Sequence, residues 1–254
     1  MLRIKTTRQE DILELLELNN VMKVTDLVEK LDVTDMTIRR DLQELEDQNL
    51  LIRIHGGARK VDNGSLPFLE LSHREKRDIN PEAKNEIAKL IAKNIHDHET
   101  VFLGSGSTIE LVYDYLDLNY AKIITNSIYV FDKFKYDDRF ELILTGGIYR
   151  SKTGSFTGTI ANDFMETIYV EKAFIGVNAI NDNKVFNANE DEGVIQRIVL
   201  NNAREKYLVA DSLKFNSLDF YQFYDLDVAD YLVTDSKLSP ELKEKYSNWV
   251  QIIN

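Results

Sequence analysis

Residues 104–108 combine two glycines with three hydroxyl side chains, directly after the apolar stretch 100–103. Glycines let backbone N–H groups converge, and hydroxyls add donors, so a strand that leads through such a loop into a helix can cradle an anion. A phosphoryl group is the ligand that suits such a loop best. The loop is not a Walker loop, and Ile109 stands where a dinucleotide fingerprint has its third glycine. The predicted ligand contacts are Gly104, Ser105, Gly106, Ser107 and Thr108. A bare strand-to-helix turn is the alternative.

Further polar or glycine-rich segments follow other apolar stretches. They are Thr125, Asn126 and Ser127; Gly146 and Gly147; and Asp211-Ser212-Leu213-Lys214. Because ligands of parallel sheets bind at the carboxyl ends of the strands, we expect these segments to share one cleft. Lys214 is the candidate charge partner of the ligand.

A second set of candidate residues lies near the N-terminus, in a helix expected over residues 36–48. Ile38, Leu42 and Leu45 share one face, which puts Met36, Arg40 and Gln43 on the opposite face, flanked by Thr37 and Arg39. Arginine can pair with guanine or phosphate, glutamine with adenine, and threonine with a base edge or phosphate. The alternative is a solvated face whose arginines are balanced by Asp41 and Glu44.

The elements around this helix favour DNA binding. Helical patterns through Ile12–Leu16 and 24–31 precede it, Thr34 or Asp35 can cap it, and an apolar alternation with a Gly56-Gly57 turn follows. The sequence therefore predicts a winged helix-turn-helix, with Arg53, His55, Arg59 and Lys60 of the wing beside the sugar-phosphate backbone. The predicted DNA contacts are Thr34, Asp35, Met36, Thr37, Arg39, Arg40, Gln43, Arg53, His55, Gly56, Gly57 and Arg59.

The rest of the chain is expected to be a larger α/β domain. Residues 61–80 have the composition of a linker with some helix, and Asn80 can cap a helix that begins at Pro81. Short apolar stretches then alternate with helical patterns to the C-terminus, which predicts a mainly parallel sheet covered by helices on both faces. The expected domains are a winged helix-turn-helix at 1–60, a linker at 61–80, and a sensor and oligomerisation domain at 81–254.

The run VTDMTIRRDLQELEDQNLLIRIHGGAR at 33–59 closely resembles the signature of the DeoR family of bacterial sugar-metabolism repressors. That resemblance implies a winged helix-turn-helix joined to a domain that senses a sugar phosphate. The loop at 104–108, the Thr-x-Ser turn and the Asp-x-x-Lys motif also resemble the sensor domain of this family in order. That domain is similar in fold to ribose 5-phosphate isomerase. The last motif of the family is Asp-x-Ser-Lys, whereas residues 211–214 here read Asp-Ser-Leu-Lys, so the two middle positions match only loosely.

The isomerase-like fold raises a competing class, an enzyme that carries a DNA-binding head. Proton transfer would need a carboxylate near the sugar carbon, and Glu190, Asp191 and Glu192 are candidates. Acids are also favoured at a helix N-terminus, where these three lie. Asn178 stands where the similar isomerases carry an acid, and an amide cannot act as the base. We therefore expect binding without turnover, with Asn178 and Glu192 holding sugar hydroxyls.

Composition restricts the classes of protein to which the chain can belong. The chain has 254 residues, no cysteine and a net charge of −12. Residues 1–60 hold ten Lys and Arg against twelve Asp and Glu, so their net charge is only −2. No apolar run is long enough to cross a bilayer, and we expect a cytoplasmic protein that needs neither a metal nor a cofactor. The stretch His96-Asp97-His98 is read as a solvated turn.

The expected mechanism is a population shift. Operator DNA would bind a homodimer or homotetramer with its heads correctly spaced, and a sugar phosphate would favour another arrangement. Within the family, the ELSHREK segment and the wing resemble regulators of lactose utilisation, which implies tagatose 6-phosphate as the effector. A fructose or other hexose phosphate, and co-repression instead of induction, stay open.

Overall fold

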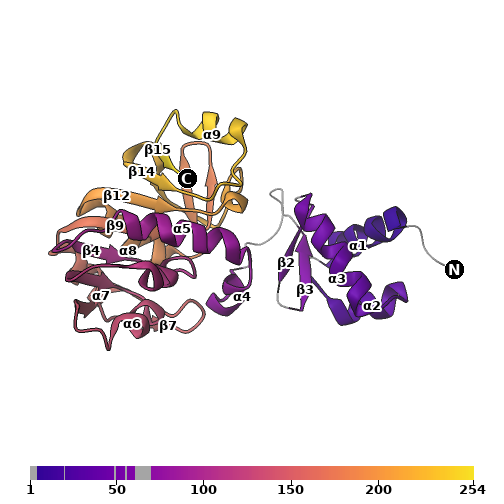
Figure 1. Cartoon of the computed structure of the whole chain (residues 1–254), viewed down its shortest axis with the longest axis horizontal. Coiled ribbons are helices and arrows are strands. Elements are labelled where there is room, and N and C mark those ends of the chain that lie inside the picture. Colours follow the sequence, from indigo (N-terminus) through magenta and orange to yellow (C-terminus); the bar gives the residue numbers. More distant parts are fainter. Residues whose placement is uncertain (1–4, 20, 49, 55, 61–69) are drawn as a thin grey trace. The chain divides into compact units, whose positions relative to one another are not determined.

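The computed structural model describes residues 5–19, 21–48, 50–54, 56–60 and 70–254 (Figure 1). The chain forms two compact units, Met1–Ser65 and Leu66–Asn254. We call them the head and the sensor unit. The segment 61–80, expected as a linker, is divided between them, and its last part already forms helix α4 (His73–Arg77) of the sensor unit.

The head consists of three helices and a small antiparallel sheet. Its elements are α1 (Lys5–Asn19), β1 (Val21–Lys23), α2 (Val24–Leu31), α3 (Asp35–Asp47), β2 (Leu51–Ile54) and β3 (Gly57–Lys60). The strand order β1-β3-β2 places the two wing strands beside a strand that precedes α2. A single core joins the helices to the sheet, with Ile12, Leu27 and Ile38 fully buried. The predicted winged helix-turn-helix is confirmed.

Seven parallel strands form the central sheet of the sensor unit, in the order β15-β14-β12-β9-β4-β5-β6. Their bounds are β4 Thr100–Leu103, β5 Ala121–Thr125, β6 Phe140–Leu144, β9 Val170–Gly176, β12 Ala203–Val209, β14 Tyr231–Val233 and β15 Gln251–Ile253. The chain builds β4, β5 and β6 outward in one direction and then returns to the other side of β4 with β9. The gap between β4 and β9 is therefore the point where the strand order reverses.

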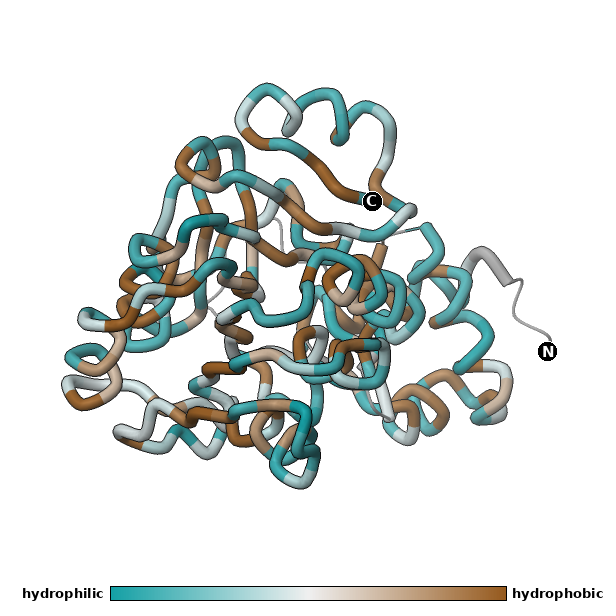
Figure 2. Tube along the Cα trace, turned by 60° about the vertical axis from the view of Figure 1, so that its left-hand side comes forward, coloured by the Kyte–Doolittle hydropathy of each residue, from teal (hydrophilic) through white to brown (hydrophobic). Residues whose placement is uncertain are grey.

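Both faces of this sheet are buried, which explains the short, continuous apolar runs in the sequence. Phe102 and Ile175 face a core formed with α7 (Thr159–Glu166), α8 (Glu190–Asn201) and α9 (Pro240–Tyr246). Val101 and Phe174 face a second core formed with α5 (Pro81–Lys93), η1 (Ile109–Tyr115) and α6 (Ile128–Phe134). Apolar stretches alternate with hydrophilic ones along the chain (Figure 2). The predicted parallel sheet with helices on both faces is confirmed.

Smaller elements complete the sensor unit. Strands β10 (Ala179–Asn181), β11 (Lys184–Asn187) and β13 (Tyr221–Asp225) form an antiparallel sheet, and β7 (Ile148–Arg150) pairs with β8 (Ser155–Thr157). Two short 3-10 helices, η2 (Ser212–Lys214) and η3 (Leu226–Val228), follow β12 and β13. Within the described ranges, no helix is long and apolar enough to cross a membrane.

One local prediction is wrong in its detail. Asn80 does occupy the N-cap position of α5, but its side chain makes no capping hydrogen bond. Its backbone lies in the left-handed region, with φ of 49°, a conformation that asparagine tolerates better than most residues. Asn80 therefore provides the turn between α4 and α5, while Pro81 starts the helix.

Candidate DNA-contacting helix and effector pocket

Helix α3 presents the predicted outward face. Thr34 caps it, accepting a hydrogen bond from the backbone N–H of Thr37 at 3.3 Å, which settles the choice between Thr34 and Asp35 as the cap. Ile38, Leu42 and Leu45 are buried. Opposite them, Met36 is 81% exposed, the Arg40 side chain is 75% exposed, and Gln43 is also exposed.

Acidic neighbours already contact the polar residues of this face. Arg39 pairs with Asp35 and Arg40 with Glu44, each one helical turn away, and Gln43 donates to Asp47 at 2.9 Å. Exposed pairs of this kind contribute only about 0.3–0.5 kcal/mol, so phosphate or base edges can replace them. The expectation of arginines balanced by acids therefore holds for the unbound head without excluding DNA contact. Asp41, in contrast, is buried and accepts from Arg8 of α1 at 3.0 Å.

The wing is anchored to the helices at both of its strands. The Arg53 N–H donates to Glu46 of α3 at 3.0 Å, and Lys60 pairs with Glu17 of α1. Gly57 is required by close approach, because a Cβ there would lie 2.2 Å from the carbonyl oxygen of Met22. Gly56 has φ of 76° and no atom near the position of a Cβ. His55 lies outside the described residues. Arg53, Gly56, Gly57 and Arg59 thus all lie on the two-stranded wing or its turn.

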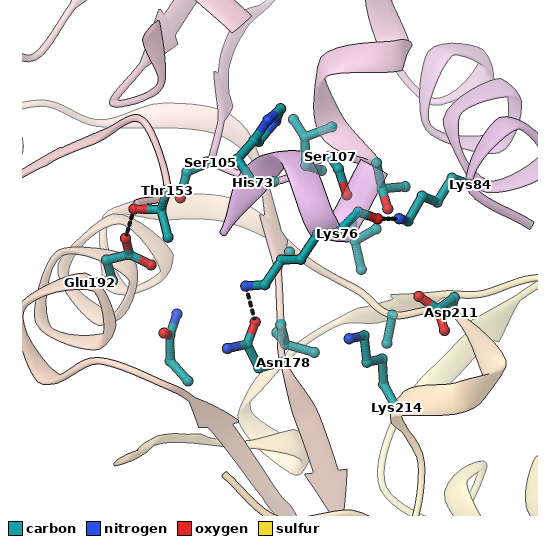
Figure 3. Close-up of a pocket in the computed structure, with 18 of the residues that line it drawn as sticks. His73, Lys76, Lys84, Ser105, Ser107, Thr153, Asn178, Glu192, Asp211 and Lys214 are labelled. Carbon is teal, nitrogen blue, oxygen red and sulfur yellow. Dashed lines mark hydrogen bonds between the residues drawn. The ribbon is translucent and has the colours of Figure 1, made fainter. Parts of the chain in front are cut away.

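The sensor unit contains a pocket at the carboxyl ends of β12, β9 and β4, the strands that meet at the reversal point (Figure 3). Its space is about 740 Å³ when open solvent at the mouth is included. The loop after β4 contributes Ser105, Gly106, Ser107 and Thr108. Gly104 lies just outside, where its N–H donates to Phe174 at 3.0 Å and holds the start of the loop against β9.

Lysines from three elements reach this pocket: Lys76 from α4, Lys84 from α5 and Lys214 from η2 (Figure 3). The ammonium of Lys76 donates to the Asn178 side-chain oxygen at 3.0 Å. Burial lowers the pKa of Lys76, and the charge of Lys214 acts in the same direction. Three cations around one cavity are an arrangement that an anionic ligand would stabilise.

Lys84 connects the pocket with helix α4. Its ammonium donates to the backbone carbonyl oxygen of Lys76 (Figure 3), and the side chain is buried. Burial lowers the pKa of Lys84 to about 8, although the nearby Asp211 carboxylate favours the charged form. A fraction of Lys84 is therefore neutral near neutral pH, and a bound anion would restore its charge.

Lys214 projects from the turn that follows β12. Asp211 accepts from the Leu213 N–H at 3.0 Å and so fixes this turn. Among the described residues, the Lys214 ammonium has no hydrogen-bond or ion-pair partner. This is the placement expected of a lysine that holds a ligand charge.

Glu192 lies in the first turn of α8 and lines the pocket. One of its two carboxylate oxygens, Oε1, already accepts three hydrogen bonds. That oxygen accepts from Arg150 and from Ser155, each at 2.6 Å, and from Thr153. Arg150 is in turn held by Glu70 at 2.9 and 3.0 Å. A carboxylate paired with a guanidinium and two hydroxyls is a structural anchor and a poor general base. Glu190 and Asp191 are exposed at the helix N-terminus, as acids there commonly are.

Amide side chains form the remaining polar wall. Asn178 donates to Asp219 at 3.0 Å while it accepts from Lys76. Asn187 donates to Gln196 at 2.9 Å, and both line the cavity. Amides can donate to and accept from sugar hydroxyls, so this wall suits a polyol.

Two predicted strand-end segments do not line the pocket. Thr125, Asn126 and Ser127 are buried after β5, where Thr125 accepts from the Ser127 N–H at 3.0 Å and Ser127 caps α6. Gly146 and Gly147 follow β6, and a Cβ at Gly147 would lie 2.5 Å from Thr157. Both strands lie on the far side of β4 from the reversal point. These residues shape turns, and the structure gives them no direct place beside a ligand in the pocket.

Several pocket residues were not predicted from the sequence: His73, Lys76, Lys84, Thr153, Asn187 and Gln196. Asp211, from a segment that was expected to share the cleft, also lines the pocket. One signal could have revealed Lys84. It lies on the same helical face as Ile87, Ala88 and Ile91, so a charged residue interrupts a buried stripe. Lys76, within the charged run at 72–78, carries no such signal. His73 is buried, stacks on Tyr129 at 3.7 Å and lies 3.0 Å from Glu110.

The fold and the two sites define a class: a DNA-binding regulator with a winged head and a separate ligand-sensing unit. Residues 8–63 match the DeoR-like helix-turn-helix domain, and residues 79–236 match the DeoR C-terminal sensor domain. The chain belongs to the DeoR family. It is a transcriptional regulator and not an enzyme.

Similar proteins extend over almost the whole chain. The lactose phosphotransferase system repressor of Lactococcus lactis subsp. lactis is 39% identical, over 98% of each chain. The repressor of the same description from Streptococcus mutans is 38% identical, over 98% of this chain and 99% of its own. The one from Staphylococcus aureus strain NCTC 8325 is 34% identical with the same coverage.

Solved structures resemble the chain at low sequence identity. Ribose 5-phosphate isomerase A from Neisseria gonorrhoeae is 14% identical, covers 52% of each chain and has a TM-score of 0.37. Ribose 5-phosphate isomerase from Methanocaldococcus jannaschii is 18% identical, covers 55% of this chain and 56% of its own, and has a TM-score of 0.38. Similarity at this level carries no information about activity.

Proposed function

We propose that this chain represses a sugar-utilisation operon and leaves its operator when a phosphorylated sugar fills the sensor pocket. The observation that carries the proposal is the convergence of Lys76, Lys84 and Lys214 on one pocket beside the hydroxyl-rich loop at 105–108. Its relatives are named as repressors of the lactose phosphotransferase system, which favours a sugar of that pathway. We take tagatose 6-phosphate as the first candidate effector.

In the proposed complex with DNA, α3 enters the major groove and the wing lies along the backbone. Met36, Arg40 and Gln43 face base edges, and Thr37 and Arg39 lie toward the phosphates. Thr34, Asp35, Arg53, His55, Gly56, Gly57 and Arg59 form or flank the surface that orients the head. The exposed guanidinium of Arg40 is the group on this face best suited to guanine.

In the proposed effector complex, the phosphoryl group lies between the loop 105–108 and the lysines. Charge-assisted hydrogen bonds from Lys84 and Lys214 would hold its oxygens, and the hydroxyls of Ser105, Ser107 and Thr108 would add donors. The sugar hydroxyls would meet Asn178, Asn187 and Gln196. Glu192 holds the wall through Arg150 and Thr153, and it can accept from one hydroxyl on its second oxygen. The pocket thus binds the ligand at both ends and supplies no free carboxylate for proton abstraction at Glu192.

The proposed link between the sites is helix α4, the first described helix after the head along the chain. Its Lys76 ammonium holds Asn178, and its Lys76 carbonyl accepts from Lys84. A phosphoryl group that attracts both ammonium groups competes with both bonds. Ligand binding would therefore change how α4 is held, and with it the chain that leads to the head.

Thermal unfolding of the whole chain tests the effector assignment. Tagatose 6-phosphate should raise the transition of the sensor unit, and a hundredfold excess over the dissociation constant would add about 2.7 kcal/mol. Free tagatose and inorganic phosphate, tested separately, should each give smaller shifts. If no hexose phosphate at millimolar concentration shifts the transition, the proposed effector class is wrong.

A further inference from the structure

Strand β7 is an edge strand with apolar side chains on both of its faces. Within the described residues it pairs only with β8, in the register Ile148↔Thr157, Tyr149↔Phe156 and Arg150↔Ser155. No other strand of the described ranges pairs with its second edge. Natural proteins usually protect such an edge with charge, proline or a covering segment, because it can pair with another chain.

The charged residue of β7, Arg150, is held by Glu70 and Glu192, and exposed apolar side chains lie on both faces of the strand. On one face, Ile148 is 68% exposed, and Ile160 in the first turn of α7 is 69% exposed. Gly158, two residues before Ile160, approaches the Ile148 side chain so closely that a Cβ there would be 3.0 Å away. On the other face, Tyr149 is half exposed, and its ring lies 5.4 Å from that of Phe156. A partner that covers these residues must contact both faces of β7, as a strand paired with its edge would.

Apart from Arg150 and Lys152, the sequence around β7 carries no charge in an otherwise acidic unit. Residues 142–149 and 153–162 contain no Asp, Glu, Lys or Arg, whereas 29% of the whole chain is charged. Residues 61–254 carry a net charge of −10. Two copies would repel one another over most of this surface, and the β7 region is a place where they can meet without like-charge contact.

We propose that two copies of this chain associate through antiparallel pairing of their β7 strands, centred on Tyr149. A second copy is the occupant that the geometry favours, because antiparallel pairing of identical edges generates the two-fold axis of a closed dimer. Ile148 and Ile160 of each copy are then covered on one side of the paired strands, and Tyr149 and Phe156 on the other. β7 lies beside α6, at the margin of the sensor unit away from β14 and β15 (Figure 1).

This surface is connected to the pocket through its own hairpin. Arg150 of β7 donates to Glu192 at 2.6 Å, and Thr153 of the connecting turn lines the pocket. Association through β7 therefore orders one pocket wall. The proposed association goes beyond the proposed effector and does not depend on it.

The chain has no cysteine, so a single introduced thiol tests the pairing in the whole protein. Tyr149→Cys should form a covalent dimer under mild oxidation, since central residues of an antiparallel pair lie within disulfide reach. Crosslinking at micromolar protein should be at least about a hundredfold faster than for Val228→Cys, because paired thiols have a millimolar effective concentration. Val228 is similarly exposed but lies between β13 and β14.

Sedimentation equilibrium gives the second measurement. Wild-type protein and Val228→Glu should associate alike, and Ile148→Glu should weaken association at least about tenfold while its far-ultraviolet circular dichroism stays unchanged. Equal crosslinking of the two cysteine variants would overturn the proposal. So would a wild type that is monomeric at tens of micromolar, or an Ile148→Glu variant that associates like wild type.

Discussion

The head and the sensor unit use positive charge in opposite ways. On α3 the arginines are exposed and paired with acids one turn away, as Arg39 is with Asp35 and Arg40 with Glu44. In the pocket, the lysines are partly or fully removed from water, and Lys214 has no pairing acid among the described residues. Exposed arginines can exchange their acidic partners for DNA phosphates or base edges at little cost in free energy. Lysines that are withdrawn from water and have no acid beside them favour a compact anion that fits the pocket.

The largest expected effect follows from the unpaired lysine. Lys214→Met should weaken effector binding about 10- to 150-fold, because a hydrogen bond to a charged group contributes about 1.5–3 kcal/mol. Operator affinity without effector should stay unchanged. Isothermal titration with tagatose 6-phosphate measures the loss, and Lys237→Met, at a lysine paired with Glu82 outside the pocket, is the matched control. Equal binding by both variants would remove Lys214 from the site.

The corresponding change on the head is Arg40→Ala. Loss of a bidentate contact with guanine should cost about 1–3 kcal/mol on the operator and leave effector binding intact. Fluorescence anisotropy on operator and random DNA separates the two roles. An equal loss on both sequences would mark Arg40 as a phosphate contact, and Lys30→Ala, an exposed lysine of α2, controls for general charge.

Dependence on pH should differ between the two regions. The pKa of Lys84 is lowered to about 8 in the empty protein, and a bound phosphate dianion favours its charged form. Effector affinity should therefore be highest at about pH 7–8, where the phosphate is mostly a dianion, and fall by up to about tenfold per unit between 8 and the ordinary lysine value near 10.4. The Lys84→Gln variant should bind the effector more weakly at pH 7, and its affinity should not decrease further between pH 8 and pH 10. Operator affinity should stay flat over pH 7–9, because guanidinium groups do not titrate there.

The smallest expected effect concerns stability of the head alone. Thr34→Ala removes the N-cap of α3 and should lower the free energy of unfolding of the head by about 1 kcal/mol, with a parallel loss of operator affinity. Ser239→Ala removes the corresponding cap of α9 in the sensor unit. Urea unfolding should show each loss in its own unit. A shared transition that moves equally in both variants would show that the units unfold together.

The sequence predicted the head more completely than the pocket, and the reason is physical. The outward face of α3 follows from local helical periodicity and a cap, which need no knowledge of the tertiary fold. The loop at 104–108 and Lys214 follow from strand ends in the same way. Which strand ends meet depends on strand order, and this order excludes Thr125 and Gly146 from the pocket. Lys76 reaches the pocket because α4 packs on the sensor unit, a contact that its charged neighbours conceal.

Coupling between the DNA-contacting head and the effector pocket can be measured directly. Operator affinity should be determined by anisotropy at fixed salt, with and without saturating tagatose 6-phosphate, for the wild type and for Lys214→Met. We expect the effector to weaken wild-type binding at least about tenfold, a coupling of about 1.4 kcal/mol, and to leave the variant unaffected. Unchanged operator affinity, while calorimetry shows the wild-type pocket to be filled, would contradict it.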